Sequence, residues 1–561
     1  MTFSVADFNL KKLLNYTDWK LLLFLILFLN VKLEVKIVAI FMIYLLRTNF
    51  KFGFKFSFKN SRLPLFYLLI IGVAFINLVF NSNFSSPHYL AIFFIGICFW
   101  LLCILAIHQV KLAVENNETQ IIHNTILVFF VLNAIVSFFT LAHIIWQTGA
   151  INPYNYQGEY QKYFIGTGDY IMGLSFDTST TNAVLCAFGV IYFITRNNIG
   201  MAFTSMIVFL LTGSNFVNLM LMLILILVFC FKSNRNQKSI ILICFMFLVV
   251  FMAKVSPQNN KYVLGSISNL YYDPGQDTVA IQTATLISHQ PKKKAVASPE
   301  EIKRKFAQDY IDSICTVDAR FNKPAVIQTA HIITTAQSAF PVYKGRIFIV
   351  SPNLNKPQYQ TATDTTDEER RLLAFIGSHK SSLPLSTQNV FIPESPGKFT
   401  GYVQTISFLL HNPFKIIAGD GIGNFSSKLA FKATGLGFQG SFPEKMVYIS
   451  RDFLVNHLDI YLNFFSKGAG LHSLSNTPFS VYDQLLAEYG ILGVLAFTLF
   501  YMGFFAKHYK QLTYGLPILL LMIPVFFIDY WFEQLSVLAF FELLLLLNIK
   551  ETTFLNPAIN V

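Results

Sequence analysis

Long apolar runs recur along the chain and are separated by shorter polar stretches. Each run is close to the roughly 20 residues that an α-helix needs to cross a bilayer. Because lipid offers a backbone no hydrogen bonds, such runs form helices. The pattern therefore predicts an all-α polytopic membrane protein with about 12 transmembrane helices. The predicted spans are 18–31, 34–46, 63–81, 88–110, 121–147, 176–195, 199–213, 215–231, 238–255, 480–506, 511–528 and 530–548.

One long polar interval separates the ninth predicted span from the tenth, and we predict that it forms a single large external loop. The turn-forming sequence TGSN leaves two alternatives for residues 199–231, which form either two helices or one bent helix. The pattern divides the chain into a nine-span region (1–255), a polar insertion (256–397), a membrane-proximal loop (398–479), the last three spans (480–550) and a cytoplasmic tail (551–561).

Composition excludes a soluble protein, because 54% of the 561 residues are hydrophobic and only 13% are charged. A net charge of +12 is also found in proteins that bind nucleic acid. Here, however, Lys and Arg occupy alternate short loops, as orientation signals do. This bias predicts a cytoplasmic N-terminus and places residues 256–479 on the outer face. Because the positive charge is explained by topology, we expect no nucleic-acid partner. The residues that carry the bias are Lys11, Lys12, Arg47, Lys51, Lys55, Lys59, Arg62, Lys111, Arg196, Lys232, Arg235, Lys238, Lys507 and Lys510.

The cysteines are consistent with this topology. Five of the six cysteines lie in apolar runs, where cysteine behaves as a small hydrophobic residue, and Cys315 alone lies in the polar interval. One cysteine cannot form a disulfide within the external loop. The loop must therefore be ordered by packing or by contact with the spans.

The membrane-proximal loop contains a glycine-rich segment, GDGIGNFSSK, after an amphipathic helix predicted at about 399–411 and a proline. The segment lacks the Gly-Lys-Ser/Thr ending of a nucleotide-binding P-loop. It is better explained as a turn. Successive backbone N–H groups in such a turn can bind an anion, and we expect those of Gly421 and Gly423 to face a lipid diphosphate.

Several acidic residues lie in or beside the last three spans. Glu488 falls about two turns into the tenth span, where an ionisable group costs about 2.5–3.5 kcal/mol on insertion scales. Such a group is expected to face a polar cavity or a partner. Glu542, in the last span, raises the same question without an evident partner. Asp529 and Glu533 flank the turn between the last two spans and are expected to be exposed.

Three stretches occur in a characteristic order: NPFKIIAGDGIGNF, then a histidine in HSLSNTPFSVYDQ, then LLAEYGILGVLAF at the start of a late span. This combination resembles the signature region of the O-antigen ligase and O-antigen polymerase family over residues 398–500. The resemblance implies a metal-independent, inverting glycosyltransferase without a cofactor, in a bacterial inner membrane with its large loop in the periplasm. Its donor would be a polyprenyl diphosphate-linked oligosaccharide. Its acceptor would be another lipid-linked glycan, a lipid A core or a protein.

The resemblance also suggests roles for individual residues. His472 is the candidate base that deprotonates the acceptor hydroxyl, and His457 is the competing candidate. Lys398 stands where relatives often have arginine and would neutralise the departing diphosphate. Glu488 completes the predicted catalytic set. The predicted substrate-binding residues are Lys415, Gly421, Gly423, Arg451 and Asp483.

Simpler explanations remain for the same residues. His472 can be an ordinary loop histidine, Lys398 and Arg451 can contact lipid phosphates, and Glu488 can be structural. The polar segment 176–183 can line a groove for substrate or pack helices together. A secondary transporter or saccharide exporter is the main alternative function, although nine spans, a loop and three spans do not form the matched halves common in transporters. A non-catalytic scaffold is a third possibility.

Overall fold

The structure is a computed structural model that describes residues 16–30, 32–47, 52–54, 63–81, 83–155, 170–255, 397–434, 442, 446–457, 460 and 477–555. His472 and the polar insertion up to residue 396 lie outside these ranges. Within them the protein is all-helical, apart from one isolated bridge between Phe54 and Leu63. The predicted fold class is therefore confirmed at this level.

Most helices follow the predicted apolar runs within a few residues, but the last predicted span, 530–548, is divided into a short helix (Trp531–Gln534) and a longer one (Leu538–Leu555) that extends into the predicted tail. The first region contains α2 (Trp19–Phe28), α3 (Leu33–Leu46), α4 (Phe66–Phe80), α5 (Pro87–Asn116), α6 (Thr119–Thr148), α7 (Ser179–Thr195), α8 (Ile199–Leu211), α9 (Asn215–Phe231) and α10 (Arg235–Val250). Residues 199–231 thus form two helices, and Gly213 with φ +66° lies in the turn between them.

The later region begins with four helices near the glycine-rich turn: α16 (Gly397–His411), α17 (Pro413–Ala418), α18 (Lys428–Ala433) and α19 (Arg451–Asn456). It then contains α21 (Val481–Leu495), which continues through a π-helical stretch into α22 (Gly503–Ala506). The remaining helices are α23 (Gly515–Val525), α24 (Trp531–Gln534) and α25 (Leu538–Leu555).

The apolar helices make this a membrane protein. Four have the length and composition to cross a bilayer: Pro87–Asn116, Thr119–Thr148, Arg235–Val255 and Val481–Ala506. Six shorter apolar helices have 10–17 residues. The total of 12 spans, with one external loop between the ninth and the tenth, stays a prediction.

Short polar residues fix where several helices begin. The side chains of Ser86, Thr178 and Asn198 accept hydrogen bonds from backbone N–H groups in the first turns of α5, α7 and α8. Asn234 and Gln237 form a reciprocal capping box at the start of α10. These caps separate apolar segments that would otherwise run on with little interruption.

Polar side chains also join helices inside the bundle. Asn133 of α6 donates to Oδ1 of Asn182 at 2.8 Å, and Asn182 donates to the Ile171 carbonyl at 2.8 Å. Residue 182 therefore packs helices together, which is one of the two roles open to segment 176–183. Glu542 of α25 accepts from Tyr501 at 2.8 Å and also from Tyr67. The partners of Glu542 that the sequence did not reveal are thus two phenol groups.

The loops at one end of the bundle are linked to one another. Arg196, after α7, lies 3.2 Å from Glu551 near the end of α25. Lys232, after α9, donates to the Leu512 carbonyl at 2.5 Å, and Gln237 donates to the Thr195 carbonyl at 3.1 Å. These contacts hold the ends of α7, α9 and α25 and the start of α10 on one side of the molecule.

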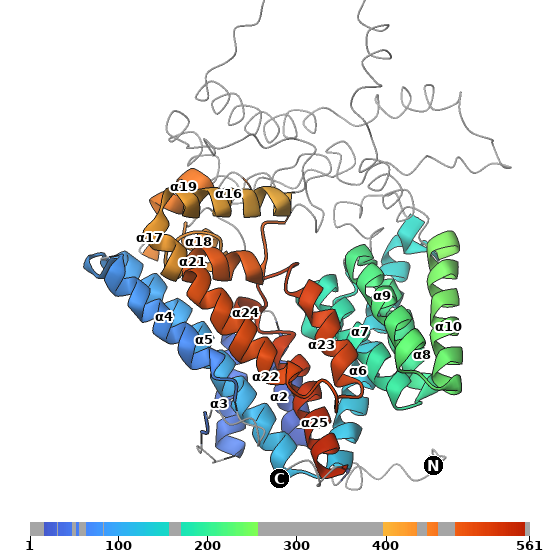
Figure 1. Cartoon of the computed structure of the whole chain (residues 1–561). Helices are drawn as coiled ribbons and strands as arrows, with labels where there is room; N and C mark the ends of the chain where they lie inside the picture. Colours follow the sequence, from blue (N-terminus) through green and yellow to red (C-terminus); the bar gives the residue numbers. More distant parts are fainter. Residues whose placement is uncertain are drawn as a thin grey trace, which may run out of the picture.

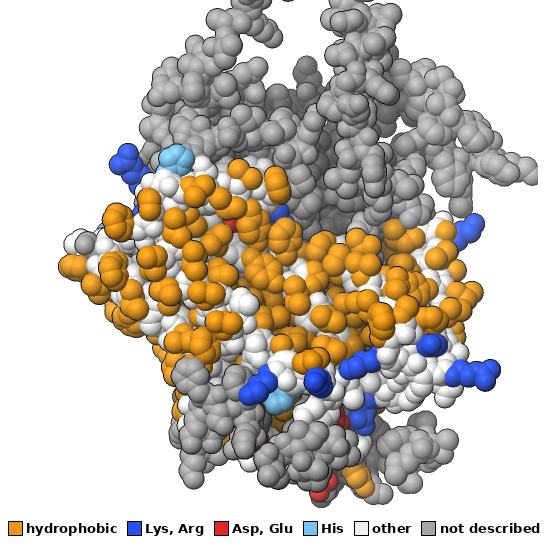
Figure 2. All heavy atoms as spheres, viewed as in Figure 1, with side chains coloured by type: hydrophobic (Ala, Val, Ile, Leu, Met, Phe, Trp, Pro, Cys, Tyr) orange, Lys and Arg blue, Asp and Glu red, His pale blue; other side chains and the backbone are white. Residues whose placement is uncertain are grey.

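The glycine-rich region lies at the opposite end. In Figure 1, α16 to α19 lie above the ends of α4 and α21, and α6 to α10 form a second group beside them. Figure 2 shows a broad belt of hydrophobic side chains on this face, with most visible Lys and Arg side chains along the edge away from α16. The assignment of that edge to the cytoplasm stays a prediction from the charge pattern.

Candidate functional site

The glycine-rich turn after α17 folds around the side chain of Glu488. Oε2 of Glu488 accepts from the Gly423 N–H at 3.0 Å, and Oε1 accepts from the N–H groups of Phe425 and Ser427 at 3.2 and 3.1 Å. Glu488 is fully buried, and these three bonds compensate for the loss of water around its carboxyl group. The N–H groups of the turn are thus bonded to a carboxyl group of the protein itself.

This arrangement differs from the expectation that Gly421 and Gly423 hold a lipid diphosphate. The Gly421 N–H donates to the Glu488 carbonyl at 3.0 Å, and the Asp420 N–H donates to the Ala487 carbonyl at 2.9 Å. The N–H groups of both glycines are therefore already bonded to α21. The physical reason is that α21 packs directly on the turn, leaving no layer between them for a ligand.

Two glycines permit this close packing. Gly419 and Gly490 have φ of +82° and +63°, values that other residues rarely adopt. A Cβ on Gly419 would lie 2.3 Å from the Glu488 carbonyl carbon, and one on Gly490 would lie 2.5 Å from the Ile417 oxygen. The turn and the middle of α21, where Gly490 interrupts the helix, are therefore one structural unit, in which GDGIGNF packs against EYG.

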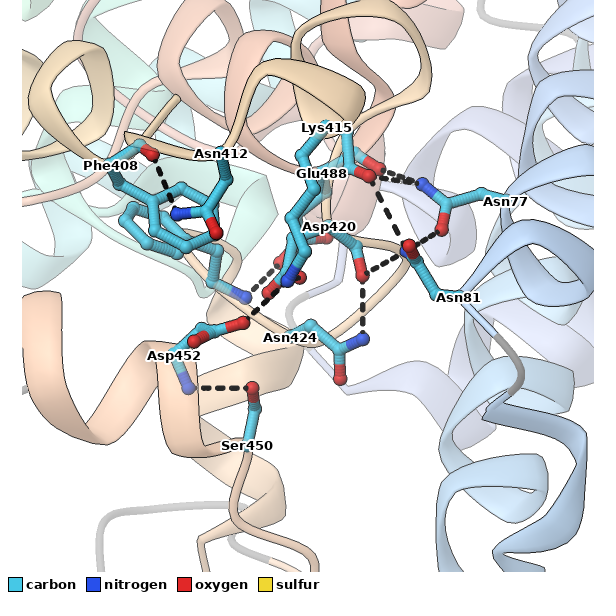
Figure 3. A network of polar contacts seen from close by, with 12 residues as sticks. Asn77, Asn81, Phe408, Asn412, Lys415, Asp420, Asn424, Ser450, Asp452 and Glu488 are labelled. Atoms are coloured by element: carbon cyan, nitrogen blue, oxygen red, sulfur yellow. Dashed lines mark hydrogen bonds and ion pairs between the residues drawn. The ribbon is translucent and has the colours of Figure 1, made fainter. Parts of the chain in front are cut away.

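Asn77 of α4 and Asn81, which caps the end of that helix, also bond to the turn, as Figure 3 shows. Nδ2 of Asn77 lies 2.6, 2.9 and 3.2 Å from the carbonyl oxygens of Ala418, Gly419 and Glu488. Asn81 donates to the Asp420 carbonyl at 3.1 Å and to Oδ1 of Asn77. Sequence reasoning missed both residues. Their signal was two amides four residues apart on one face of an otherwise apolar helix.

Lys415 pairs with two carboxylates beside the turn (Figure 3). Its Nζ lies 2.5 Å from Oδ1 of Asp420 and 2.6 Å from Oδ2 of Asp452, and it also lies 5.1 Å from the centre of the Phe408 ring. Burial works against the charge of Lys415, yet the two carboxylates raise its pKa. Burial raises the pKa of Asp420 to about 7, opposed by Lys415. Any contact of Lys415 with a diphosphate would thus compete with these carboxylates.

Lys398 is buried under the start of α16 and joins three segments. Its Nζ donates to Oγ1 of Thr477 at 2.8 Å, to the Ile528 carbonyl at 3.3 Å and to the Phe479 carbonyl. An ammonium has three donors, and here each has an acceptor. Burial lowers the pKa of Lys398, opposed by nearby Asp529 and Asp483. The role of neutralising a diphosphate stays a prediction, and any such contact requires these bonds to be exchanged.

His457 and Asp483 meet beneath α16. Nε2 of His457 lies 3.8 Å from Oδ2 of Asp483, and both side chains are buried. The hydroxyls of Thr405 and Ser426 lie beside the same carboxylate. Burial lowers the pKa of His457 to about 3, so its imidazole is neutral at pH 7. Of the two candidate bases, the structure places His457 next to a predicted substrate-binding residue, while His472 lies outside the described residues.

The acidic residues between the last two helices correct one expectation. Asp529 is only 6% exposed and accepts from Nε2 of Gln534 at 2.9 Å. Glu533 accepts from the Leu429 N–H at 3.0 Å and from Nε2 of Gln484 at 2.6 Å. The prediction of exposure was wrong for Asp529, and Glu533 is half-buried, because the 529–535 segment turns inward beneath α18 and buries its aromatic side chains.

Arg451 is the remaining predicted residue. It is exposed at the first position of α19, and it makes no hydrogen bond or ion pair with the part of the chain that the structure describes. Among the predicted cations Lys398, Lys415 and Arg451, it is therefore the one that can meet a ligand without losing a contact within the described ranges.

Within the described ranges, no group of three or more His, Cys, Asp or Glu side chains is arranged to hold a metal ion. No protein-family model, curated protein or solved structure matches the chain. The resemblance to O-antigen ligases and polymerases thus rests on the quoted motifs alone.

Proposed function

We propose that this protein is a membrane glycosyltransferase that transfers or polymerises glycan from a polyprenyl diphosphate carrier. The observation that carries the proposal is the pair formed by His457 and Asp483, 3.8 Å apart and next to the glycine-rich turn. A histidine beside a carboxylate is an arrangement suited to accepting a proton from a hydroxyl group. The resemblance supplies the substrate class, and the His457–Asp483 pair supplies a means of activating an acceptor.

The proposed reaction needs a base for the acceptor hydroxyl. Burial lowers the pKa of His457 to about 3 in the closed site, so neutral His457 accepts the proton only once its ring is exposed, and the carboxylate of Asp483 then stabilises the resulting imidazolium. Such a base contributes about a hundredfold to ten-thousandfold. Because His457 is fully buried, the acceptor reaches it only when α16 or α19 moves. His472 remains the alternative base.

The reaction also needs positive charge for the departing diphosphate. Arg451 is exposed and can approach two phosphate oxygens with its planar fork of donors. We assign Lys398 and Lys415 to positioning, because their ammonium groups bond to the segments around the turn. Glu488 likewise holds the turn against α21 and is a positioning residue in this proposal.

The test measures glycan transfer by the full-length protein in vesicles, with a polyprenyl diphosphate oligosaccharide as donor. We expect His457→Ala to lose roughly 10²-fold or more of the rate. His411→Ala changes an exposed histidine on α16 and is the matched control. Arg451→Ala should weaken transfer, and a chelator should leave the wild-type rate unchanged.

The outcomes separate the candidates. If His472→Ala loses glycan transfer while His457→Ala keeps a normal rate, His472 is the base. Normal rates in both histidine variants, or loss of activity in a chelator, would overturn the proposed mechanism. The same donor also decides between polymerase and ligase, because a polymerase lengthens the lipid-linked chain and a ligase moves it to a different acceptor.

A further inference from the structure

Helix α16 has its polar and apolar faces the wrong way round for a helix on a water-exposed surface. Its buried side is polar over its first half, with Lys398, Thr400, Gln404 and Thr405 each no more than 6% exposed, and becomes apolar only at Phe408 and Leu409. A helix that lies between a protein core and water normally buries its apolar stripe and exposes its polar residues. The reversed order indicates that the outer side of α16 faces an apolar medium.

The exposed side is a continuous apolar stripe that runs over α16 and α17. On α16 its members recur every three or four residues, which places them on one helical face, and two more follow on α17 after the break at Asn412. They are Phe399 at 65%, Val403 at 40%, Ile406 at 48%, Leu410 at 68%, Phe414 at 95% and Ile417 at 60% exposure. So large an unbroken apolar surface marks an interaction site.

The stripe continues into the membrane belt of the protein. Helix α17 packs against the outer ends of α4 and α21. Val79 and Phe80, at that end of α4, are 66% and 81% exposed, and Leu495 of α21 is 46% exposed. Figure 2 shows hydrophobic side chains passing without a break from the belt to the level of α16. The medium that covers the belt is lipid, so lipid is also the occupant that fits the stripe.

We propose that α16 and α17 lie in the membrane interface, with this stripe in contact with lipid. The polar side of α16 then forms the roof over Asp483, His457 and Thr477, close to the depth of lipid head groups. A lipid-linked substrate would thus approach this cluster from the side, within the membrane, rather than from the aqueous phase. The placement of α16 and α17 rests on exposure and position alone, whereas the lateral approach of a lipid-linked substrate rests on the proposed function.

The test places single tryptophans on the stripe of the full-length protein in phospholipid vesicles. Ile406→Trp and Phe414→Trp replace exposed residues, so neither change disturbs a packed core. His411→Trp, on the flank of the same helix, is the matched control. The fluorescence of the added tryptophan is obtained by subtracting the emission of the parent protein, which has four tryptophans. It is measured in vesicles whose lipid acyl chains are brominated and, separately, with iodide in the aqueous phase.

In brominated lipid we expect the added emission of the two stripe variants to fall by roughly half or more, while iodide has little effect. The control should respond more strongly to iodide. Quenching of the stripe variants by iodide would show that the stripe faces water. Protection from both quenchers would show that another segment or a second copy covers it. Either result would overturn the proposal.

Discussion

At the scale of single residues, the buried charges near the glycine-rich turn are each held by specific partners. Glu488 has three backbone N–H groups, Lys398 has three acceptors, and Lys415 has two carboxylates. A buried ion without such partners would be costly. The partners therefore determine what each substitution removes.

We predict that Glu488→Gln destabilises the protein by about 1–3 kcal/mol. An amide has one oxygen, so at least one of the three N–H donors of the turn would face an NH₂ group instead of an acceptor. Glu115→Gln is the control, because the Glu115 side chain is 37% exposed and its ion pair with Lys111 is long, at 3.6 Å. Thermal unfolding in detergent measures both variants. Equal melting temperatures for the two would contradict the structural role of Glu488.

His457 predicts a pH dependence of stability. Its folded pKa, about 3, lies below the usual value of 6.5 because the ring is buried. The unfolded chain therefore binds the proton first, and stability present above pH 6.5 is lost as the pH falls from about 6.5 towards 3. The loss is on the order of 1 kcal/mol per pH unit. His457→Gln should show a smaller drop in melting temperature between pH 7 and pH 5, and an unchanged drop would count against the buried neutral ring.

At the scale of elements, the close approach of the turn to α21 depends on Gly419 and Gly490. Adding a methyl group at Gly490 puts a residue with φ +63° in a strained conformation, at about 1–3 kcal/mol, and forces it against Ile417. We expect Gly490→Ala to lower both stability and transfer activity. Gly72→Ala, in α4, has open space around the new methyl group and is the control. A Gly490→Ala protein as stable as the Gly72→Ala protein would show that the two segments do not pack this tightly.

The sequence predicted the helices well, because apolar runs and capping residues are local signals. It also identified the glycine turn and the unusual depth of Glu488. It did not show that these two features bind each other, since the partners of Glu488 are backbone groups that carry no side-chain signature. Asn77 was missed because its acceptors are more than 300 residues away in the chain. Asp529 was taken as exposed because a turn between spans normally meets water.

At the scale of the whole molecule, one native cysteine tests the predicted topology. Cys315 lies in the polar interval, whereas the other five cysteines lie in the described helices. We predict that a membrane-impermeant maleimide labels the wild-type protein in intact spheroplasts and fails to label Cys315→Ser. Labelling that appears only in inverted vesicles would place the long interval on the cytoplasmic side.

The alternative function, transport, also bears on the whole molecule. Buried ionisable groups such as Glu542 and Asp483 occur in transporters as well as in membrane enzymes. The two functions differ in the fate of the carrier lipid. A transferase breaks the bond between sugar and diphosphate, whereas a transporter leaves its substrate intact on the other side of the membrane.

The most direct test of the proposed function measures cleavage of the bond between the sugar and the diphosphate. Purified full-length protein is reconstituted with a labelled polyprenyl diphosphate oligosaccharide and an acceptor glycan, and the lipid and glycan products are both quantified. We predict that polyprenyl diphosphate is released in equal amount to the glycan gained by the acceptor. Movement of intact labelled oligosaccharide across the membrane, without release of polyprenyl diphosphate, would contradict the proposed glycosyltransferase.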